Sequence, residues 1–290
     1  MTAPTSRILQ VLGFLFAVGV GVAAGSAPLH AQSPMRWVPL DPEYTIYIDV
    51  PDGRVVVELS RDFAPQHVEQ FRLLAREGHY EGYSFARVIE GFLAQAAEPT
   101  FKKEIRTGRE ALPAEFERDW SDELPYVSVD PPDQFGEESG LVNGFPVRRS
   151  LSEGKVWITR CPGILGFARQ NEPNTGRSSF WITLQNVQPN DRNDTAFGRV
   201  VWGMEHISRL PRTEGFDFEA GAPVVSVQVA ADLPIEERLQ LEVLDTSDPS
   251  FPEFLEAGRA GSGEFYVQRP LRISLCSLAL VLPARGVEAR

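Results

Sequence analysis

The sequence has few of the residues that usually carry metal or nucleophilic chemistry. Only two of its 290 residues are cysteine and four are histidine. The histidines are scattered, without ligand spacing to one another or to the cysteines, so we expect no metal site. No G-x-S-x-G elbow, the signature of many serine hydrolases, is present either. Metal-dependent and serine-hydrolase functions are therefore disfavoured.

Positive charge is also scarce. Lysine and arginine together number 28 against 40 aspartates and glutamates, which gives a net charge of -12. A nucleic-acid partner is not expected, because phosphate binding needs a basic face. An acidic balance by itself is usually a solubility property.

The only long apolar run lies near the N-terminus, over residues 8–24. Arg7 precedes it, and small residues followed by Leu29 and Ala31 end it, which is the pattern of a secretory signal. We predict a signal peptide over residues 1–31 and a periplasmic or secreted protein. An uncleaved membrane anchor is the alternative.

The two cysteines, Cys161 and Cys276, lie in apolar segments that read as strands. In an exported protein such a pair can form a disulfide. Two buried thiols are the other interpretation.

Hydrophobic content is 42%, as in ordinary globular proteins. Residues 44–50 and 54–59 alternate as strands around a Pro-Asp-Gly turn and predict a β-hairpin. A helix is predicted over 64–76, where Pro65 stands in the first turn and apolar residues share one face. Further segments predict strands at 85–89, 92–97, 163–168, 179–184, 196–201 and 224–230, and a short helix at 203–210. Many short strands with two helices favour a mainly β fold, a closed barrel capped by helices.

Two segments interrupt this pattern. Residues 100–155 are rich in acidic residues and proline and predict a long acidic loop insertion, with local structure at Trp120 or 141–145. Residues 231–290 predict helices at 234–243 and 249–255 and a terminal strand at 271–282, as a C-terminal extension packed on the barrel. A separate small domain is the alternative.

Three stretches, taken in order, resemble the cyclophilin family of peptidyl-prolyl isomerases. The first runs from Phe63-Ala-Pro65 through GHYEG (78–82) to SFARVIEGFLAQ (84–95), against the family pattern F-H-R-V-I-x-G-F-M-x-Q-G-G. The second is GILGFA (163–168) with SSFWI (178–182), and the third is FGRVVWGM (197–204). The resemblance covers residues 44–230, taken as one cyclophilin-like domain. It implies an eight-stranded antiparallel barrel with two capping helices, and cis/trans isomerisation of X-Pro bonds without cofactor or metal.

The resemblance also implies roles for individual residues. Arg87 would be catalytic, because a fixed guanidinium can donate to the prolyl nitrogen of a twisted amide. Gln95 would bond the substrate backbone as a second catalytic residue. The positions that match substrate-binding residues are Phe92, Leu93 and Trp181 for the proline ring, and Ala168 and Ser179 along the groove. The alternative interpretation is that Arg87 is a surface residue in an ion pair, and that Phe92 and Trp181 are ordinary core residues.

Several positions depart from the family pattern. Ala86 replaces a histidine, Ser179 a glutamine and Ala96-Ala97 two glycines, and the loop 188–194 lacks the usual tryptophan and histidine. Three hypotheses remain: a monomeric isomerase that helps exported proteins fold, a weakly catalytic module that binds proline-containing segments, and a structural or partner-docking role for the insertion and extension. The expected partners are proline-containing peptides and unfolded exported proteins.

Overall fold

The structure is a computed structural model that describes residues 35–130, 134–260, 267–268, 273–282 and 284–286. These residues belong to one compact unit, Pro34–Arg290. The predicted signal peptide, 1–31, lies outside the described residues. No helix within the described ranges has the length and apolar character needed to cross a membrane.

The predicted N-terminal hairpin and first helix are confirmed. Strands β2 (Thr45–Val50) and β3 (Gly53–Leu59) pair antiparallel around the Pro-Asp-Gly turn. Helix α1 (Pro65–Arg76) buries its apolar face, including Phe71 and Leu74. Its own N-cap, Ala64, offers no side-chain acceptor. Glu115 takes that place, since its carboxylate accepts from the backbone N–H groups of Gln66 and His67.

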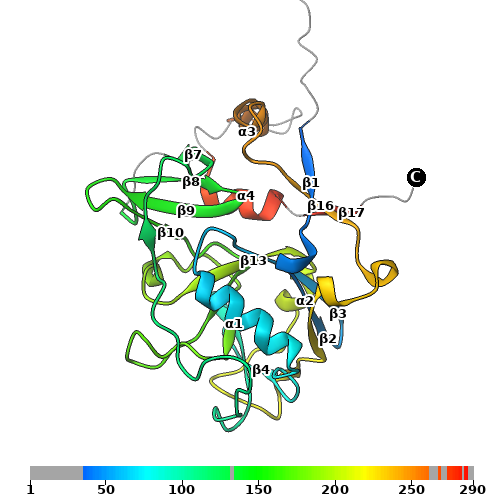
Figure 1. The fold of residues 1–290 in the computed structure, drawn as a ribbon. Coiled ribbons are helices and arrows are strands. Elements are labelled where there is room, and N and C mark those ends of the chain that lie inside the picture. Colours follow the sequence, from blue (N-terminus) through cyan, green and yellow to red (C-terminus); the bar gives the residue numbers. More distant parts are fainter. Residues whose placement is uncertain (1–34, 131–133, 261–266, 269–272, 283, 287–290) are drawn as a thin grey trace, which may run out of the picture. The chain divides into compact units, whose positions relative to one another are not determined.

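One curled antiparallel sheet organises the centre of the unit (Figure 1). Its strand order is β14-β4-β5-β12-β11-β13-β3-β2-β15. The remaining strands are β4 (Ser84–Val88), β5 (Leu93–Ala97), β11 (Ile164–Phe167), β12 (Phe180–Thr183), β13 (Ala196–Trp202), β14 (Ala222–Pro223) and β15 (Ser226–Val229). The short helix α2 (Met204–Ser208) follows β13, as predicted. The prediction of a mainly β fold is confirmed. The predicted closure into an eight-stranded barrel stays a prediction, because the observed sheet is a curled row of nine strands that runs from β14 to β15.

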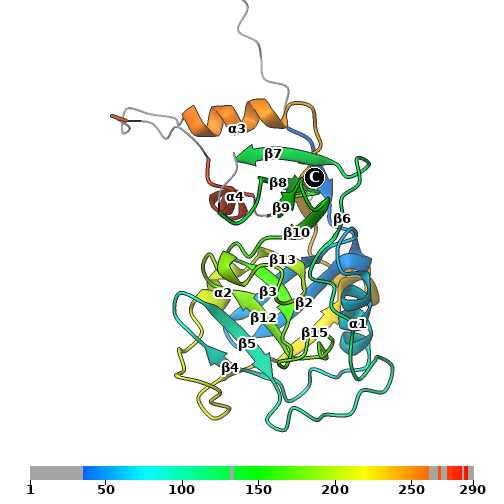
Figure 2. The same cartoon turned by 90° about the vertical axis from the view of Figure 1, so that its left-hand side faces the viewer.

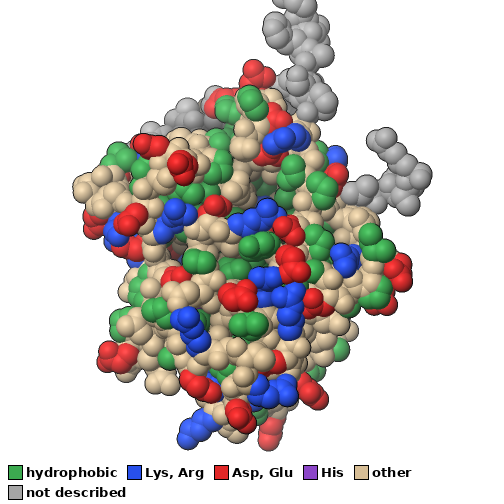
Figure 3. Space-filling view, viewed as in Figure 1, with side chains coloured by type: hydrophobic (Ala, Val, Ile, Leu, Met, Phe, Trp, Pro, Cys, Tyr) green, Lys and Arg blue, Asp and Glu red, His purple; other side chains and the backbone are tan. Residues whose placement is uncertain are grey.

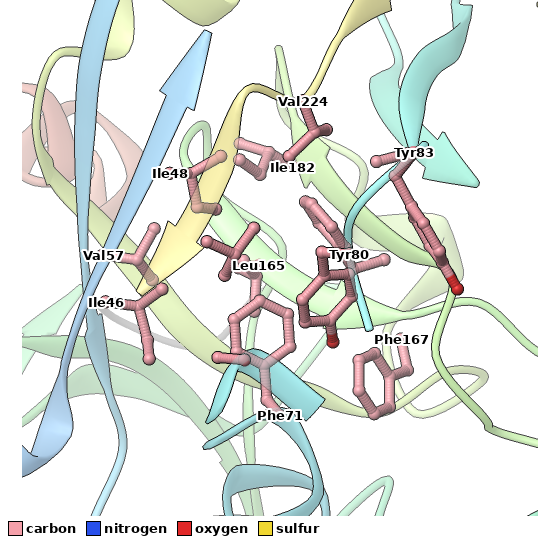
Figure 4. Packing of buried hydrophobic residues seen from close by; sticks show 14 of the residues in the cluster. Ile46, Ile48, Val57, Phe71, Tyr80, Tyr83, Leu165, Phe167, Ile182 and Val224 are labelled. Atoms are coloured by element: carbon pink, nitrogen blue, oxygen red, sulfur yellow. The ribbon is translucent and has the colours of Figure 1, made fainter. Parts of the chain in front are cut away.

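Side chains from one face of this sheet pack against α1 to form the main core. Phe71 of α1 contacts Phe167 and Phe180, with ring centroids 5.8 and 5.5 Å apart. Figure 4 shows Phe71 among Ile46, Leu165 and other apolar side chains of the sheet. The opposite face of β5 and β12 is therefore left for other contacts.

The prediction of a long acidic loop over 100–155 was wrong for its second half. Five strands within residues 118–130 and 134–158 form an antiparallel sheet, which we call the insert sheet (Figure 2). Its strands are β6 (Arg118–Asp119), β7 (Tyr126–Asp130), β8 (Glu138–Val142), β9 (Phe145–Ser150) and β10 (Lys155–Ile158). An Asn143-Gly144 turn with positive φ at both residues joins β8 to β9. The acidic residues and prolines of this segment suggested a loop, whereas strands β8 and β9 bury apolar residues such as Leu141 and Val147.

Two predictions for the C-terminal extension were wrong. The α-helix predicted at 234–243 is absent from the structure: a short 3-10 helix spans Ile235–Glu237, and strand β16 (Leu241–Leu244) follows it and pairs with β1 (Trp37–Pro39). Helix α4 (Leu275–Val281) occupies most of the described part of the predicted strand 271–282. Helix α3 (Phe251–Ala260) agrees with the helix predicted at 249–255. The short strand β17 (Arg285–Gly286) pairs with β16.

The insert sheet and the extension share a second apolar cluster with the main sheet. Val142, Phe145 and Ile158 of the insert sheet belong to it, together with Leu275 and Leu278 of α4. The main sheet contributes residues from its outer face, among them Leu93 and Trp181. A third cluster joins the outer face of β2, β3 and β13 to β16, through Tyr47, Val56, Val201, Leu241 and Val243. The insert sheet and α4 therefore cover part of the face on which the predicted site lies.

Candidate active site

The β4–β5 hairpin sets the register of the predicted site. Arg87 on β4 stands opposite Gln95 on β5, and Gln95 stands opposite Trp181 on β12. Neighbouring residues such as Ala94 and Phe180 point into the main core. Because strand residues alternate between faces, Arg87, Gln95 and Trp181 share the outer face of the sheet.

A chain of hydrogen bonds holds the Arg87 side chain. Arg87 Nη1 donates to Gln95 Oε1 at 3.2 Å, and Gln95 Nε2 donates to Ser179 Oγ at 3.2 Å. Ser179 Oγ in turn donates to the carbonyl oxygen of Ala96 at 2.8 Å. The guanidinium carbon lies 5.5 Å from the centroid of the Phe92 ring. The structure thus brings four predicted residues together.

The Arg87 guanidinium is free of ion pairs with the described residues. No carboxylate within the described ranges pairs with it, and partial burial alone lowers the pKa of its guanidinium. Arginine nevertheless stays protonated in proteins, so the side chain keeps free N–H donors. This environment differs from the surface ion pair that was the alternative for Arg87.

A cavity of about 280 Å³ opens next to this hydrogen-bonded chain. Gln95, Ala168 and Ser179 line it, and Phe101 and Phe216 stand at its rim. These two rings are 46% and 44% exposed and meet edge to face at 5.0 Å. Sequence reasoning missed both phenylalanines, since Phe101 lies in the presumed acidic loop and Phe216 in an irregular connection.

Buried polar groups support the floor of this cavity. Tyr83 donates to Ser178 Oγ at 2.9 Å, and its hydroxyl is 3.1 Å from His79 Nε2. Burial raises the pKa of Tyr83 to about 12, so its hydroxyl remains a donor. Burial also lowers the pKa of His79 and favours its neutral form. This chain fixes Ser178, next to Ser179, on the wall of the cavity.

Leu93 and Trp181, predicted to grip a proline ring, are buried in the second cluster instead of lining this cavity. Trp181 is only 2% exposed. Its indole lies against Gly166 on β11, where an added Cβ would come 2.3 Å from Trp181 Cζ2, so glycine is needed there. The guanidinium carbon of Arg160 stands 4.4 Å from the centroid of the indole ring.

The loop 188–194 forms the wall beyond Trp181 and is bound to the end of the insert sheet. Asp194 Oδ2 pairs with Arg160 Nη2 at 2.5 Å, and Asp194 Oδ1 pairs with Arg169 Nε at 3.2 Å. Asp191 accepts from Thr159 Oγ1 at 2.5 Å and from the backbone N–H of Arg160 at 2.9 Å. Burial raises the pKa of Asp191.

Cys161 and Cys276 form a disulfide in the structure. It ties α4 to the turn that carries Arg160, and Gln188 Nε2 lies 3.3 Å from Cys276 Sγ. Where the structure describes the chain, no group of three or more histidine, cysteine, aspartate or glutamate side chains is placed to hold a metal ion.

Comparison with known proteins agrees with this geometry. The family model described as "Cyclophilin type peptidyl-prolyl cis-trans isomerase/CLD" matches residues 45–231. A probable peptidyl-prolyl cis-trans isomerase of Brucella suis is 30% identical over 193 residues, which cover 63% of this chain and 78% of that protein. The human peptidyl-prolyl cis-trans isomerase-like 1 is 27% identical over 186 residues, 64% of this chain and 88% of that protein.

One solved structure is similar over more of the chain. The cyclophilin AquaCyp293 from Hirschia baltica superimposes with a TM-score of 0.68 at 29% identity, covering 76% of this chain and 86% of its own. The family match spans the strands that carry Arg87, Gln95 and Ser179. The chain therefore belongs to the cyclophilin-type peptidyl-prolyl cis-trans isomerase family.

Proposed function

We propose that this protein catalyses cis/trans isomerisation of X-Pro bonds in exported proteins and so assists their folding. The observation that carries the proposal is the state of Arg87: a partly exposed guanidinium, held by Gln95 and placed over Phe92, with no carboxylate partner within the described residues. Such a group is oriented and still has donors for a substrate.

The chemistry of the X-Pro bond explains why a fixed donor is sufficient. The barrier to rotation is about 18–20 kcal/mol, because the amide has partial double-bond character. At the twisted geometry the prolyl nitrogen loses conjugation and becomes an acceptor. A donor that binds this state better than either planar state lowers the barrier. Arg87 takes this role, and Gln95 holds it in place while offering its amide to the peptide backbone.

Export is supported by two features of the chain. Residues 7–31 have the basic start, apolar middle and small-residue end of a secretory signal. The Cys161–Cys276 disulfide belongs to an oxidising compartment such as the periplasm. A periplasmic or secreted enzyme would meet proline-containing segments of newly exported chains. Acidic and basic side chains are interspersed on the face shown in Figure 3, unlike the basic surface of a nucleic-acid-binding protein.

A second candidate is a module that binds proline-containing segments but turns them over slowly. The specific observation in its favour is the burial of Leu93 and Trp181 beneath the insert sheet, with Arg160 on the indole ring. A substrate would then have less apolar surface on which to hold its proline ring.

A proline-peptide isomerisation assay separates the two candidates. The proposed enzyme should accelerate exchange well beyond the uncatalysed rate, and Arg87→Ala should lose this acceleration. A wild-type protein that binds proline peptides, measured by calorimetry, without accelerating exchange would support the binding module. If the Arg87→Ala variant were as active as wild type, Arg87 would not be the catalytic donor.

A further inference from the structure

The Arg160 guanidinium covers the Trp181 ring, on which the proline ring of a substrate is expected to lie. The Trp181 indole is 2% exposed, and the Arg160 guanidinium that covers it is 1% exposed. We propose that Arg160 is a specificity-determining residue, which occupies the prolyl subsite of the free enzyme and must be displaced by the proline of a substrate. This inference rests on the proposed isomerase function and adds to it the residue that controls access to Trp181.

The backbone around Arg160 is held in place, so displacement can involve only the Arg160 side chain. Its backbone N–H donates to Asp191 Oδ1 at 2.9 Å, and its carbonyl accepts from the N–H of Val187 at 2.9 Å. The next residue, Cys161, is held by the disulfide to Cys276. Displacement is therefore a rotation of the Arg160 side chain away from Trp181, with the strands left in place.

Asp194 provides a place for the displaced guanidinium. It pairs with Arg160 in the free protein, and its side chain is 23% exposed, so it reaches solvent. Arg169, which pairs with the other oxygen of Asp194, is also partly exposed. Arg160 can keep its ion pair while it leaves the indole ring.

The closed arrangement leaves two donors unsatisfied. Within the described residues, Arg160 Nη1 and Trp181 Nε1 are buried and have no hydrogen-bond partner. Buried donors without acceptors are destabilising, and native structures rarely keep them without a reason. A bound peptide brings carbonyl oxygens that can accept from these groups. These hydrogen bonds make displacement of Arg160 feasible, but the broken cation–aromatic contact still weakens substrate binding.

Arg160 directly follows the insert sheet and lies outside the family motifs. It lies in the turn between β10 of the insert sheet and β11 of the main sheet. Three observations thus point to the same residue: the covered indole, the partly exposed ion-pair partner and the two unpaired donors.

The test measures kcat and KM separately for a proline-containing tetrapeptide. Arg160→Ala should lower KM about three- to tenfold, the factor that corresponds to a cation–aromatic contact, with kcat changed less than about twofold. Arg149→Ala is the matched control. Arg149 lies in the insert sheet, where its guanidinium carbon is 4.0 Å from the centroid of the Trp120 ring and its side chain pairs with Glu138. Its KM should equal that of wild type.

An active wild type with an unchanged or higher KM in Arg160→Ala would overturn the inference and leave the proposed function standing. If neither wild type nor Arg160→Ala accelerates exchange, the proposed function itself fails and the inference fails with it.

A second measurement uses the unaltered protein, in case Arg160→Ala does not fold. The indole N–H signal of Trp181, assigned with Trp181→Phe, should shift in an ¹H–¹⁵N spectrum when the proline peptide is added. The same peptide with alanine in place of proline should leave it unmoved. No shift of this signal at a saturating concentration of the proline peptide would contradict the displacement of Arg160.

Discussion

Arg87 and Gln95 lie opposite each other on one hairpin, and Arg87 Nη1 donates to Gln95 Oε1 at 3.2 Å. The amide orients the guanidinium before a substrate arrives, so little reorganisation is needed when the prolyl nitrogen becomes an acceptor.

Removing the guanidinium should therefore abolish most of the activity. We expect Arg87→Ala to lower kcat/KM at least about a hundredfold, the usual effect of losing one transition-state donor. Arg87→Lys should recover little, because a lysine ammonium lacks the planar fork of donors. The isomerisation rate is the measurement, with the thermal midpoint as a check of folding. Activity within twofold of wild type would contradict the assignment.

Ser179 should act on the reaction through Gln95. Its Oγ accepts from Gln95 Nε2 and donates to the carbonyl of Ala96. We expect Ser179→Ala to reduce kcat/KM several-fold in wild type and to have almost no effect in a Gln95→Ala background, because contacting residues are not additive. Equal effects of Ser179→Ala in both backgrounds would show that the two residues act independently.

The hairpin that carries Arg87 and Gln95, the proposed catalytic residues, could be predicted from the sequence, whereas the environment of Trp181 could not. Arg87 and Gln95 are eight residues apart, and the motif that contains both also contains the turn that sets their register. The contact between Arg160 and Trp181 depends on how the insert sheet packs on the main sheet. No local pattern near either residue indicates it.

Helix α4 shows how local pattern and tertiary contact can disagree. Its apolar residues alternate as in a strand, and a strand was predicted. Leu275, Leu278 and Leu282 are nevertheless spaced to share one helical face, and all three are buried in the second cluster. The packing against β9 and the disulfide at Cys276 select the helix.

Reduction of the disulfide should destabilise the protein. The bond closes a loop with a sequence separation of 115 residues. We expect its loss to lower the free energy of unfolding by about 2–5 kcal/mol, the usual range for native disulfides. Denaturant unfolding with and without reductant measures this. A Cys161→Ser/Cys276→Ser double variant should match the reduced protein and no longer respond to reductant.

Glu115 should stabilise helix α1 as a cap supplied from elsewhere in the chain. Besides two backbone N–H groups, it contacts His67 Nδ1 at 2.7 Å. Burial alone would raise the pKa of Glu115, but the hydrogen bonds from His67 and from the backbone outweigh burial and lower it. We expect Glu115→Ala to cost about 1–3 kcal/mol near neutral pH.

The pH dependence of the destabilisation by Glu115→Ala shows whether it comes from the ionised carboxylate. A carboxyl whose pKa is lowered by folding loses its contribution as pH falls below its unfolded pKa, about 4.3. The stability difference between wild type and Glu115→Ala should therefore shrink in acid. A difference that stayed constant down to about pH 3 would assign it to packing instead.

His79 should make the protein sensitive to mild acid. Burial lowers its pKa, and the positive charge of Lys103 lowers it further. The unfolded chain then binds a proton more readily than the folded one, so stability should fall as pH drops below about 6.5. The free energy of unfolding of His79→Gln should fall less steeply than that of wild type between about pH 7 and 5.5. In this range, carboxyl groups with lowered pKa values stay ionised and do not contribute to the slope. Identical slopes would exclude His79 as the cause.

The pairing of β1 with β16 joins residues 37–39 to residues 242–244. A chain that emerges from its N-terminus cannot complete this pair until nearly all of it has been synthesised. The strands at the two edges of the main sheet, β14 and β15, also come late, at residues 222–229. Such long-range pairings delay folding. For the exported protein that we propose, this late completion would leave time for the chain to cross a membrane before it becomes compact.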